Sequence, residues 1–253
     1  MRAPHDIRLL GLDFADLTLE GAARWIEARP DGAPFGYVVT PNADHFVRLK
    51  REPSFVPIYR DALLRLLDSR VVARAARGLG LPAPPVIAGS DLTARLLAPL
   101  SAGERVTIIG VRPDHLPALR VRCGLRELAH HNPPPGFERD PRAMREAVRF
   151  VLDHPARVVF LAVGSPRQEL LAAAIQAEGG GTGTGLCIGA ALDFLAGAAR
   201  RAPDWMQRAG LEWLHRLSSD PRRLARRYLR DDPPIFPMLL RERMRATAMR
   251  PGL

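Results

Sequence analysis

The sequence contains two cysteines, one lysine and few aromatic residues. Cys123 and Cys187 are the only cysteines among 253 residues, and Lys50 is the only lysine. Two cysteines are too few for a disulfide framework, and they lack the paired spacing of a structural zinc site. We therefore expect the protein to belong to a reduced, cytoplasmic compartment. Apart from Lys50, all of its Lys and Arg residues are arginines.

The sequence also lacks any apolar run long enough to cross a membrane. Its longest apolar runs, such as residues 158–163, have the length of a β-strand. Residues 1–19 alternate charged and apolar side chains and contain no signal-peptide core. We expect any contact with a membrane to be peripheral.

A nucleotide-binding glycine motif is missing as well. No Gly-x-Gly-x-x-Gly follows a predicted strand, which argues against a nucleotide-dependent oxidoreductase. Residues 179–185 are rich in glycine, but they precede a predicted strand instead of following one. This segment is therefore predicted to be a flexible connector.

The remaining composition is that of a globular protein, with 47% hydrophobic and 25% charged residues. Short apolar runs alternate with helical patterns, which indicates a parallel sheet covered by helices on both faces. The expected strands are residues 37–40, 106–110, 158–163 and 186–189. Examples of the expected helices are residues 17–28, 90–100 and 141–152. We predict one α/β domain over residues 1–199.

Two predicted strands are followed by polar residues. Gln168 and Glu169 lie where residues 158–163 run through a glycine turn into a helix, and free N–H groups at such a helix start favour a phosphate. Thr40 and Asn42 follow another strand, and parallel strands place such residues on one rim of the sheet. The alternatives are an ordinary loop at the first junction and a turn with Asn42 as helix cap at the second.

Arginine is concentrated after residue 199. Residues 200–253 contain thirteen arginines and six carboxylates, which contribute +7 to the formal net charge of +10. Residues 235–249 mix apolar and basic side chains with helical spacing, so we predict a basic helical C-terminal appendage. Its partner could be a nucleic acid, an anionic membrane surface or a diphosphate substrate.

Several motifs occur in an order that resembles the WecG/TagA/CpsF glycosyltransferases, glycosyltransferase family 26, whose members extend lipid-linked sugars for cell-surface polymers. These motifs are Thr40-Pro41-Asn42-Ala43-Asp44-His45, Asp68, Ala88-Gly89-Ser90-Asp91-Leu92, residues 164–169, Gly189-Ala190-Ala191-Leu192-Asp193-Phe194 with Gly197, Arg201-Ala202-Pro203, and Leu211-Glu212-Trp213-Leu214-His215-Arg216-Leu217 with Pro221-Arg222. The resemblance implies a Rossmann-like domain, a nucleotide-sugar donor, a polyprenyl-diphosphate-sugar acceptor and inversion at the sugar carbon without a metal or other cofactor. Two departures are Ser69 after the acidic residue, where the family usually has glycine, and Val86, where an arginine is common.

The resemblance also assigns roles to residues. Asp68 matches the acidic position of the family and is our candidate catalytic base, with Asp44 and His45 in reserve. Because no Asp-x-Asp pair occurs to hold a metal, arginines become the natural counter-charge for the leaving diphosphate. The expected substrate-binding residues are Thr40, Asn42, Asp91, Gln168, Glu169, Arg201, Arg216, Arg222 and Arg223.

We therefore expect a transferase that moves a hexose or N-acetylhexosamine from a UDP-sugar to a lipid-linked sugar at the inner face of the cell membrane. The alternative is an arginine-rich α/β protein that binds RNA without catalysis. The tail lacks the interleaved aromatic residues on which RNA bases stack, so we expect no nucleic-acid partner. The sequence leaves open the donor sugar, the acceptor sugar and whether copies form a homo-oligomer.

Overall fold

A six-stranded, all-parallel sheet forms the centre of the molecule. The structure is a computed structural model that describes residues 7–100 and 104–248, without the side chains of Pro99, Leu100, Asp204 and Arg223. The strand order is β4-β3-β8-β7-β5-β6. The strands are β3 (Gly36–Val39), β4 (Leu64–Arg65), β5 (Val106–Gly110), β6 (Leu128–His131), β7 (Val158–Ala162) and β8 (Thr184–Cys187).

The inner strands are buried on both faces, which explains why their sequences are largely apolar. In β7, Val158 and Phe160 pack on one side of the sheet, while Val159 and Leu161 pack on the other. All four expected strands are present, with boundaries shifted by up to two residues. The edge strands β4 and β6 were not predicted.

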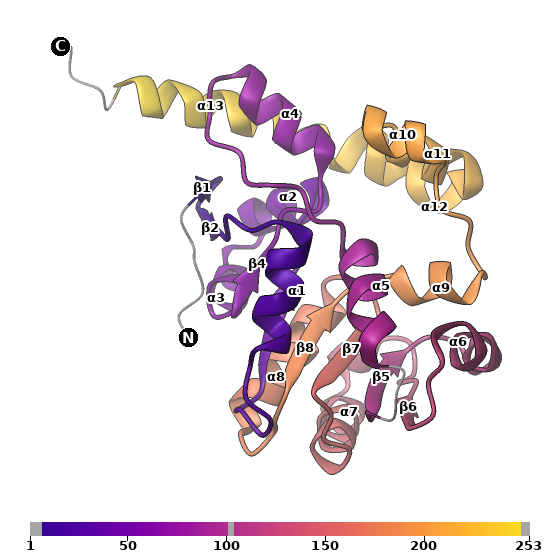
Figure 1. Cartoon of the computed structure of the whole chain (residues 1–253). Coiled ribbons are helices and arrows are strands. Elements are labelled where there is room, and N and C mark those ends of the chain that lie inside the picture. Colours follow the sequence, from indigo (N-terminus) through magenta and orange to yellow (C-terminus); the bar gives the residue numbers. More distant parts are fainter. Residues whose placement is uncertain (1–6, 101–103, 249–253) are drawn as a thin grey trace.

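Helices cover both faces of this sheet (Figure 1). One face carries α1 (Leu19–Glu27), α5 (Gly89–Leu100), α6 (Leu116–Cys123) and α9 (Ala191–Ala196). The other carries α2 (Ala43–Arg51), α3 (Val56–Arg60), α4 (Arg70–Gly78), α7 (Pro141–Asp153) and α8 (Arg167–Glu178). The prediction of an α/β fold with a parallel sheet flanked by helices is confirmed.

Short elements complete this part of the chain. A two-stranded antiparallel hairpin consists of β1 (Ile7–Leu9) and β2 (Leu12–Phe14). Single 3₁₀ turns are η1 (Pro53–Phe55), η2 (Pro113–His115) and η3 (Phe137–Arg139).

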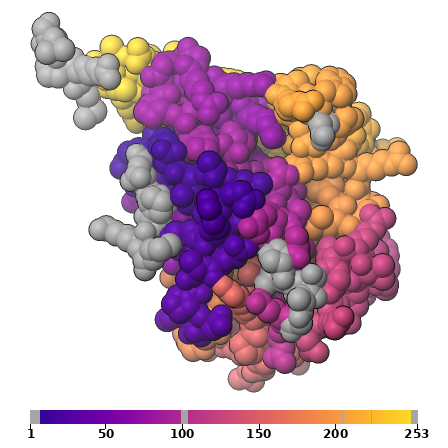
Figure 2. All heavy atoms as spheres, in the orientation of Figure 1, coloured from indigo at the N-terminus to yellow at the C-terminus, as the bar shows by residue number. Residues whose placement is uncertain are grey.

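The arginine-rich tail is helical, as predicted. It comprises α10 (Asp204–Ala209), α11 (Glu212–Ser219), α12 (Pro221–Arg226), the π-helical turn η4 (Arg227–Asp231) and α13 (Ile235–Ala248). The last residue expected in its final helix, Met249, lies outside the described residues. Figure 2 shows α13 (yellow) and α10–α11 (orange) on either side of α4 (purple).

The final helix is anchored to the body of the protein. Ile235 and Leu239 are buried in the same core as the helices on the α2 face. The carboxylate of Glu242 accepts the backbone N–H of Leu10, in the β1–β2 turn, at 2.9 Å from each oxygen. This contact ties the last described helix to the hairpin at the start of the described chain. No helix within residues 7–100 or 104–248 is long and apolar enough to span a bilayer.

Candidate functional site

A cavity of about 310 Å³ lies where the C-terminal helices meet the carboxyl ends of β3 and β4. The first turn of α2, the segment 68–71 after β4, helices α10 and α11, and the residues from η4 to the start of α13 contribute its walls. Its charged lining residues are Asp68, Arg70, Glu212, Arg216, Arg227 and Asp232. An apolar part of the wall includes Val71, Val86, Trp213, Tyr228, Pro233 and Phe236. Sequence segments more than a hundred residues apart therefore form one site.

Asp68 is fixed at this site by backbone contacts. Its own N–H donates to the carbonyl of Pro41 at 2.9 Å, and its Oδ2 accepts the N–H of Gly89, the first residue of α5, at 3.3 Å. A Cβ atom at Gly89 would lie 3.2 Å from Thr40 Oγ1 and 3.8 Å from Asp68 Oδ2. Glycine thus lets the start of the helix approach the carboxylate closely.

The surroundings of Asp68 raise its pKa to about 6. Burial is the largest cause, because removing a carboxylate from water disfavours its charged form. The charge of Arg216 and the Gly89 N–H lower the pKa, while the charges of Glu212 and Asp91 raise it. A carboxylate with such a pKa is mostly ionised at neutral pH and is a stronger base than one in water.

Arg216 points into the same cavity from α11. Its Nη2 donates to Glu212 Oε1 at 3.1 Å, one helical turn earlier. Its guanidinium carbon lies 5.4 Å from the centre of the Phe194 ring. The buried Nε atom of Arg216 has no hydrogen-bond partner. Within the described residues this guanidinium group is therefore only partly paired.

Arg201 and Asp91, both predicted to bind substrate, meet each other. Nη1 of Arg201 donates to Oδ1 of Asp91, which lies in the first turn of α5. The Nε and Nη2 atoms of Arg201 are buried without a partner. The pair lies beside the cavity wall, and neither residue is among its lining residues.

Arg227 was not predicted, although it joins the tail to the rim of the sheet. Its Nη2 donates to Asn42 Oδ1 at 3.1 Å and lies 3.9 Å from Asp44 Oδ2. Its Nε lies 3.7 Å from Asp232 Oδ2. Burial raises the pKa of Asp232 to about 6, and the charge of Arg227 opposes that shift. The sequence of residues 226–228 indicates a basic segment. It does not indicate that Arg227 is the arginine whose side chain turns toward Asn42.

Asn42 has both a local and a longer-range contact. It is the N-cap of α2, where its Oδ1 accepts the N–H of Asp44 at 3.2 Å. The same oxygen accepts the hydrogen bond from Arg227, and Asn42 lines the cavity. The helix-cap interpretation is therefore correct, and the residue also lies at the site.

Thr40, Gln168 and Glu169 are buried behind the rim and do not line the cavity. Thr40 Oγ1 donates to the carbonyl of Cys187 at 3.1 Å. Gln168 Nε2 donates to Glu169 Oε1 at 2.8 Å, and its Oε1 accepts the N–H of Gly189 at 2.9 Å. Burial raises the pKa of Glu169. These side chains join neighbouring strand ends to each other.

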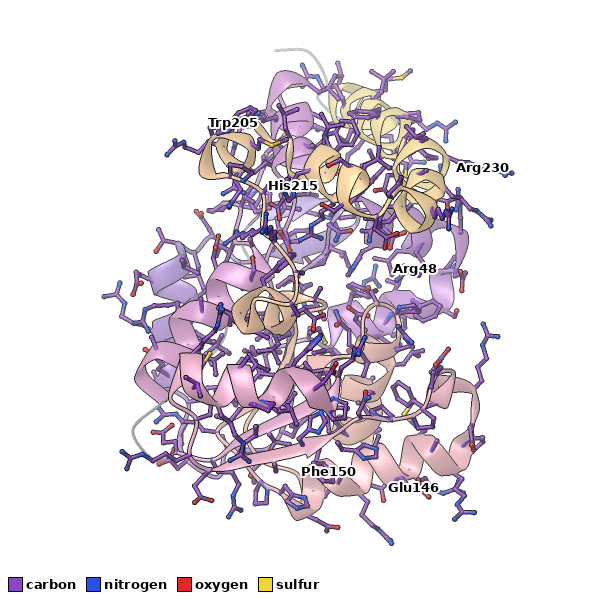
Figure 3. All side chains as sticks on the ribbon, turned by 90° about the vertical axis from the view of Figure 1, so that its right-hand side faces the viewer. Arg48, Glu146, Phe150, Trp205, His215 and Arg230 are labelled. Carbon is purple, nitrogen blue, oxygen red and sulfur yellow. The ribbon has the colours of Figure 1, made fainter. Side chains whose placement is uncertain are left out.

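The reserve bases have internal partners. His45 is buried, its Nδ1 lies 3.0 Å from the hydroxyl oxygen of Tyr59, and burial holds the pKa of His45 well below its usual range. Asp44 accepts a hydrogen bond from Arg48 Nη2 at 2.5 Å. Figure 3 shows Arg48 between the C-terminal helices and the sheet. Asp68 is therefore the stronger candidate among the three.

The remaining predicted arginines lie on α12. Arg222 is exposed and is not among the lining residues, and the side chain of Arg223 lies outside the described part of the structure. Within the described residues, no three His, Cys, Asp or Glu side chains are grouped so that they could hold a metal ion.

The chain matches a protein-family model over nearly its whole length. The family described as "Glycosyl transferase WecG/TagA/CpsF family" matches residues 7–249. This range contains the whole sheet, both layers of helices, the cavity and the C-terminal helices. It also contains every motif on which the sequence resemblance rests, and it favours the glycosyltransferase interpretation over the RNA-binding alternative.

Proposed function

This chain belongs to the WecG/TagA/CpsF family of glycosyltransferases, and on that premise we propose that it is an inverting, metal-independent enzyme of cell-surface polysaccharide synthesis. It transfers a hexose or N-acetylhexosamine from a UDP-sugar to a polyprenyl-diphosphate-linked sugar. The observation that carries the proposal is the cavity in which Asp68, with its pKa of about 6, faces Arg216 and Arg227.

In the proposed reaction, Asp68 is the general base. A hydroxyl oxygen of the acceptor sugar attacks the anomeric carbon of the donor and forms the new glycosidic bond. The bond from that carbon to the diphosphate oxygen breaks on the opposite face, and its electron pair leaves with UDP. The hydroxyl proton passes to the carboxylate of Asp68, which contributes about 10²- to 10⁴-fold to the rate, as is typical of general bases.

The leaving diphosphate needs positive charge, and we assign that task to arginines. Arg216 lines the cavity with a side chain that is 38% exposed, and Arg201 carries two nitrogens without a hydrogen-bond partner among the described residues. Guanidinium groups suit phosphate oxygens because their N–H donors are planar and fixed. Arg222 and Arg223 remain candidates for this contact on α12. The metal-independence is a prediction from these arginines and from the missing Asp-x-Asp motif.

We propose a division of labour between two parts of the chain. Residues 1–199 bind the UDP-sugar, with Asn42 at the cavity and Thr40, Gln168 and Glu169 shaping the rim behind it. Residues 200–253 close the site and contact the lipid-linked acceptor.

The outer face of α13 suits contact with an anionic membrane. Leu240 and Met244 are four residues apart, with exposed fractions of 50% and 64%. Phe236, four residues before Leu240, is 50% exposed and also lines the cavity. Arg241 and Arg245 follow two of these residues directly in the sequence. Apolar side chains flanked by arginines favour the headgroup boundary of an anionic leaflet. We propose that this row holds the enzyme on the inner face of the cell membrane, where the acceptor is displayed.

A transfer assay tests the proposal. The purified protein is mixed with a polyprenyl-diphosphate-linked sugar and, in turn, with UDP-glucose, UDP-glucuronic acid and UDP-N-acetylmannosamine, with and without EDTA. We expect acceptor-dependent UDP release from at least one donor, undiminished by EDTA. Release from none of the donors, or release only with added magnesium or manganese, contradicts the proposal.

A further inference from the structure

Glu212 is a charged residue of the cavity to which the proposed reaction gives no role. It lies at the start of α11, and its side chain is 21% exposed. Its Oε1 accepts the hydrogen bond from Arg216 Nη2 at 3.1 Å. Both side chains line the cavity together with Asp68.

Arg216 is held in place by two neighbours that are not the catalytic carboxylate. Glu212 binds one end of its guanidinium group, and the ring of Phe194 lies 5.4 Å from the guanidinium carbon. The charge of Arg216 lowers the pKa of Asp68, but the two residues form no ion pair within the described part of the chain. The arginine therefore lies near Asp68 without neutralising it.

We infer that Glu212 is a positioning residue that holds Arg216 off Asp68, so that the arginine stays available for the leaving diphosphate and Asp68 stays free to take a proton. This inference rests on the proposed function, and it adds a residue that acts through Arg216 and not on substrate. An ion pair between Arg216 and Asp68 would damage both roles at once. It would occupy the guanidinium donors, and it would make the carboxylate a weaker base.

Other charges face Asp68 from each neighbouring element. Arg216 and Glu212 come from α11, Asp91 and the Gly89 N–H come from α5, and Arg70 of α4 and Arg227 of η4 line the same cavity. Arg201 interacts electrostatically with both Asp68 and Glu212. Removing the negative charge of Glu212 leaves the arginines less balanced, so the pKa of Asp68 falls. Removal of the Glu212 charge should therefore move the midpoint of the pH profile to lower pH.

The test is the pH dependence of kcat/KM for the wild type and Glu212→Gln. If Asp68 is the base, wild-type activity rises with pH through a midpoint near 6, the pKa of Asp68. For Glu212→Gln we expect this midpoint to move down by about 0.5 to 1 pH unit and the plateau kcat to fall by about tenfold. Glu212→Asp retains the charge, so its midpoint should return toward that of the wild type.

A matched control exists on α7. Arg142 Nε and Glu146 Oε1 form an ion pair of the same i, i+4 spacing at 3.1 Å, and Figure 3 shows Glu146 at the end of the molecule remote from the C-terminal helices. Glu146→Gln should leave both the midpoint and the plateau unchanged.

The possible outcomes separate the inference from the proposed function. A lowered midpoint in Glu212→Gln, restored in Glu212→Asp, supports the inference. An unchanged midpoint in Glu212→Gln overturns it, whether or not the rate falls, because the charge of Glu212 then has no influence on the titration of Asp68. If Glu212→Gln does not fold, Glu212→Ala takes its place and is judged by the same two outcomes. Failure of the proposed function is recognised separately, by an Asp68→Asn enzyme that keeps its activity.

Discussion

Asp68 is a carboxylate that the fold partly withdraws from water, so its ionised form destabilises the native state. Its pKa is about 6 in the folded protein, against an ordinary value of 3.8 for an aspartate. Above pH 6 the group is ionised in both the folded and the unfolded chain, and the folded state alone bears the cost of burying the charge.

Asp68→Asn should therefore raise the free energy of unfolding at pH 7.5 by about 1 to 3 kcal/mol. The amide oxygen can still accept the Gly89 N–H, and no charge is buried. The gain should shrink as the pH falls from 6 to 4, because wild-type Asp68 then becomes protonated in the fold. Urea denaturation at pH 7.5 and 4.5 measures both effects.

A matched control is Asp31→Asn, whose side chain is 89% exposed and which should change stability by less than about 0.5 kcal/mol. A less stable Asp68→Asn protein at pH 7.5 would mean that the ionised carboxylate makes contacts worth more than its burial costs.

Single residues also show the limits of sequence reasoning. Asn42 and Asp68 could be placed at the site because each follows a strand of a parallel sheet, or matches a family motif. Which tail arginine turns inward could not be predicted, because it depends on how α11 and η4 are rotated against the sheet. Arg216 points into the cavity and Arg222 does not, although both belong to the same basic segment.

At the scale of elements, burial decided which strands were predictable. The inner strands β5 and β7 are largely apolar because both faces are covered, and β8 is apolar only in its second half, Leu186 and Cys187. β4 contains Arg65, which is buried and donates to four backbone carbonyls, so its sequence does not read as a strand. β6 is an edge strand with two histidines, and His130 Nε2 lies 2.8 Å from the carbonyl oxygen of Gly110.

Helix α13 has two different faces, and only the outer one is proposed to contact membrane. Leu240→Gln with Met244→Gln should weaken binding to phosphatidylglycerol vesicles by about thirtyfold, because each removes an exposed apolar side chain worth about 1 kcal/mol on burial. Co-sedimentation with vesicles measures the effect. Ile235 and Leu239, on the inner face, are left intact so that the fold is preserved.

The control for this variant is Val121→Gln. Val121 is an exposed apolar residue of α6, with an exposed fraction of 84%, on an element remote in sequence from α13. Its replacement should leave vesicle binding unchanged. Equal vesicle binding by the wild type and the α13 variant would contradict the proposal that these apolar side chains contact the membrane.

At the scale of the whole molecule, the C-terminal helical appendage packs against the α/β body. Ile235 and Leu239 share a core with the helices of one face, and Glu242 binds the β1–β2 turn. A truncation after Ala199 would therefore expose that core as well as remove the membrane-facing row. Point variants are the better probe of function.

The packing of the C-terminal helices on the α/β body is the part of the site that the sequence did not predict. The local patterns gave the sheet, its carboxyl rim and a basic helical ending. The motif order gave a candidate base and candidate leaving-group arginines, and these roles stay predictions. The closure of the tail over residues 68–71 could not be predicted, because it depends on long-range packing of Ile235 and Leu239 and on single hydrogen bonds such as that of Arg227 to Asn42.

The most direct measurement is the turnover of Asp68→Asn in the transfer assay, made beside calorimetric titration of the same protein with UDP. We expect kcat to fall by about 10²- to 10⁴-fold, because a general base is lost, while the affinity for UDP stays close to that of the wild type, because the arginines remain. An Asp68→Asn enzyme that folds, binds UDP and turns over at near the wild-type rate would contradict the account. It would mean that Asp68 is not the base that takes the acceptor proton in this cavity.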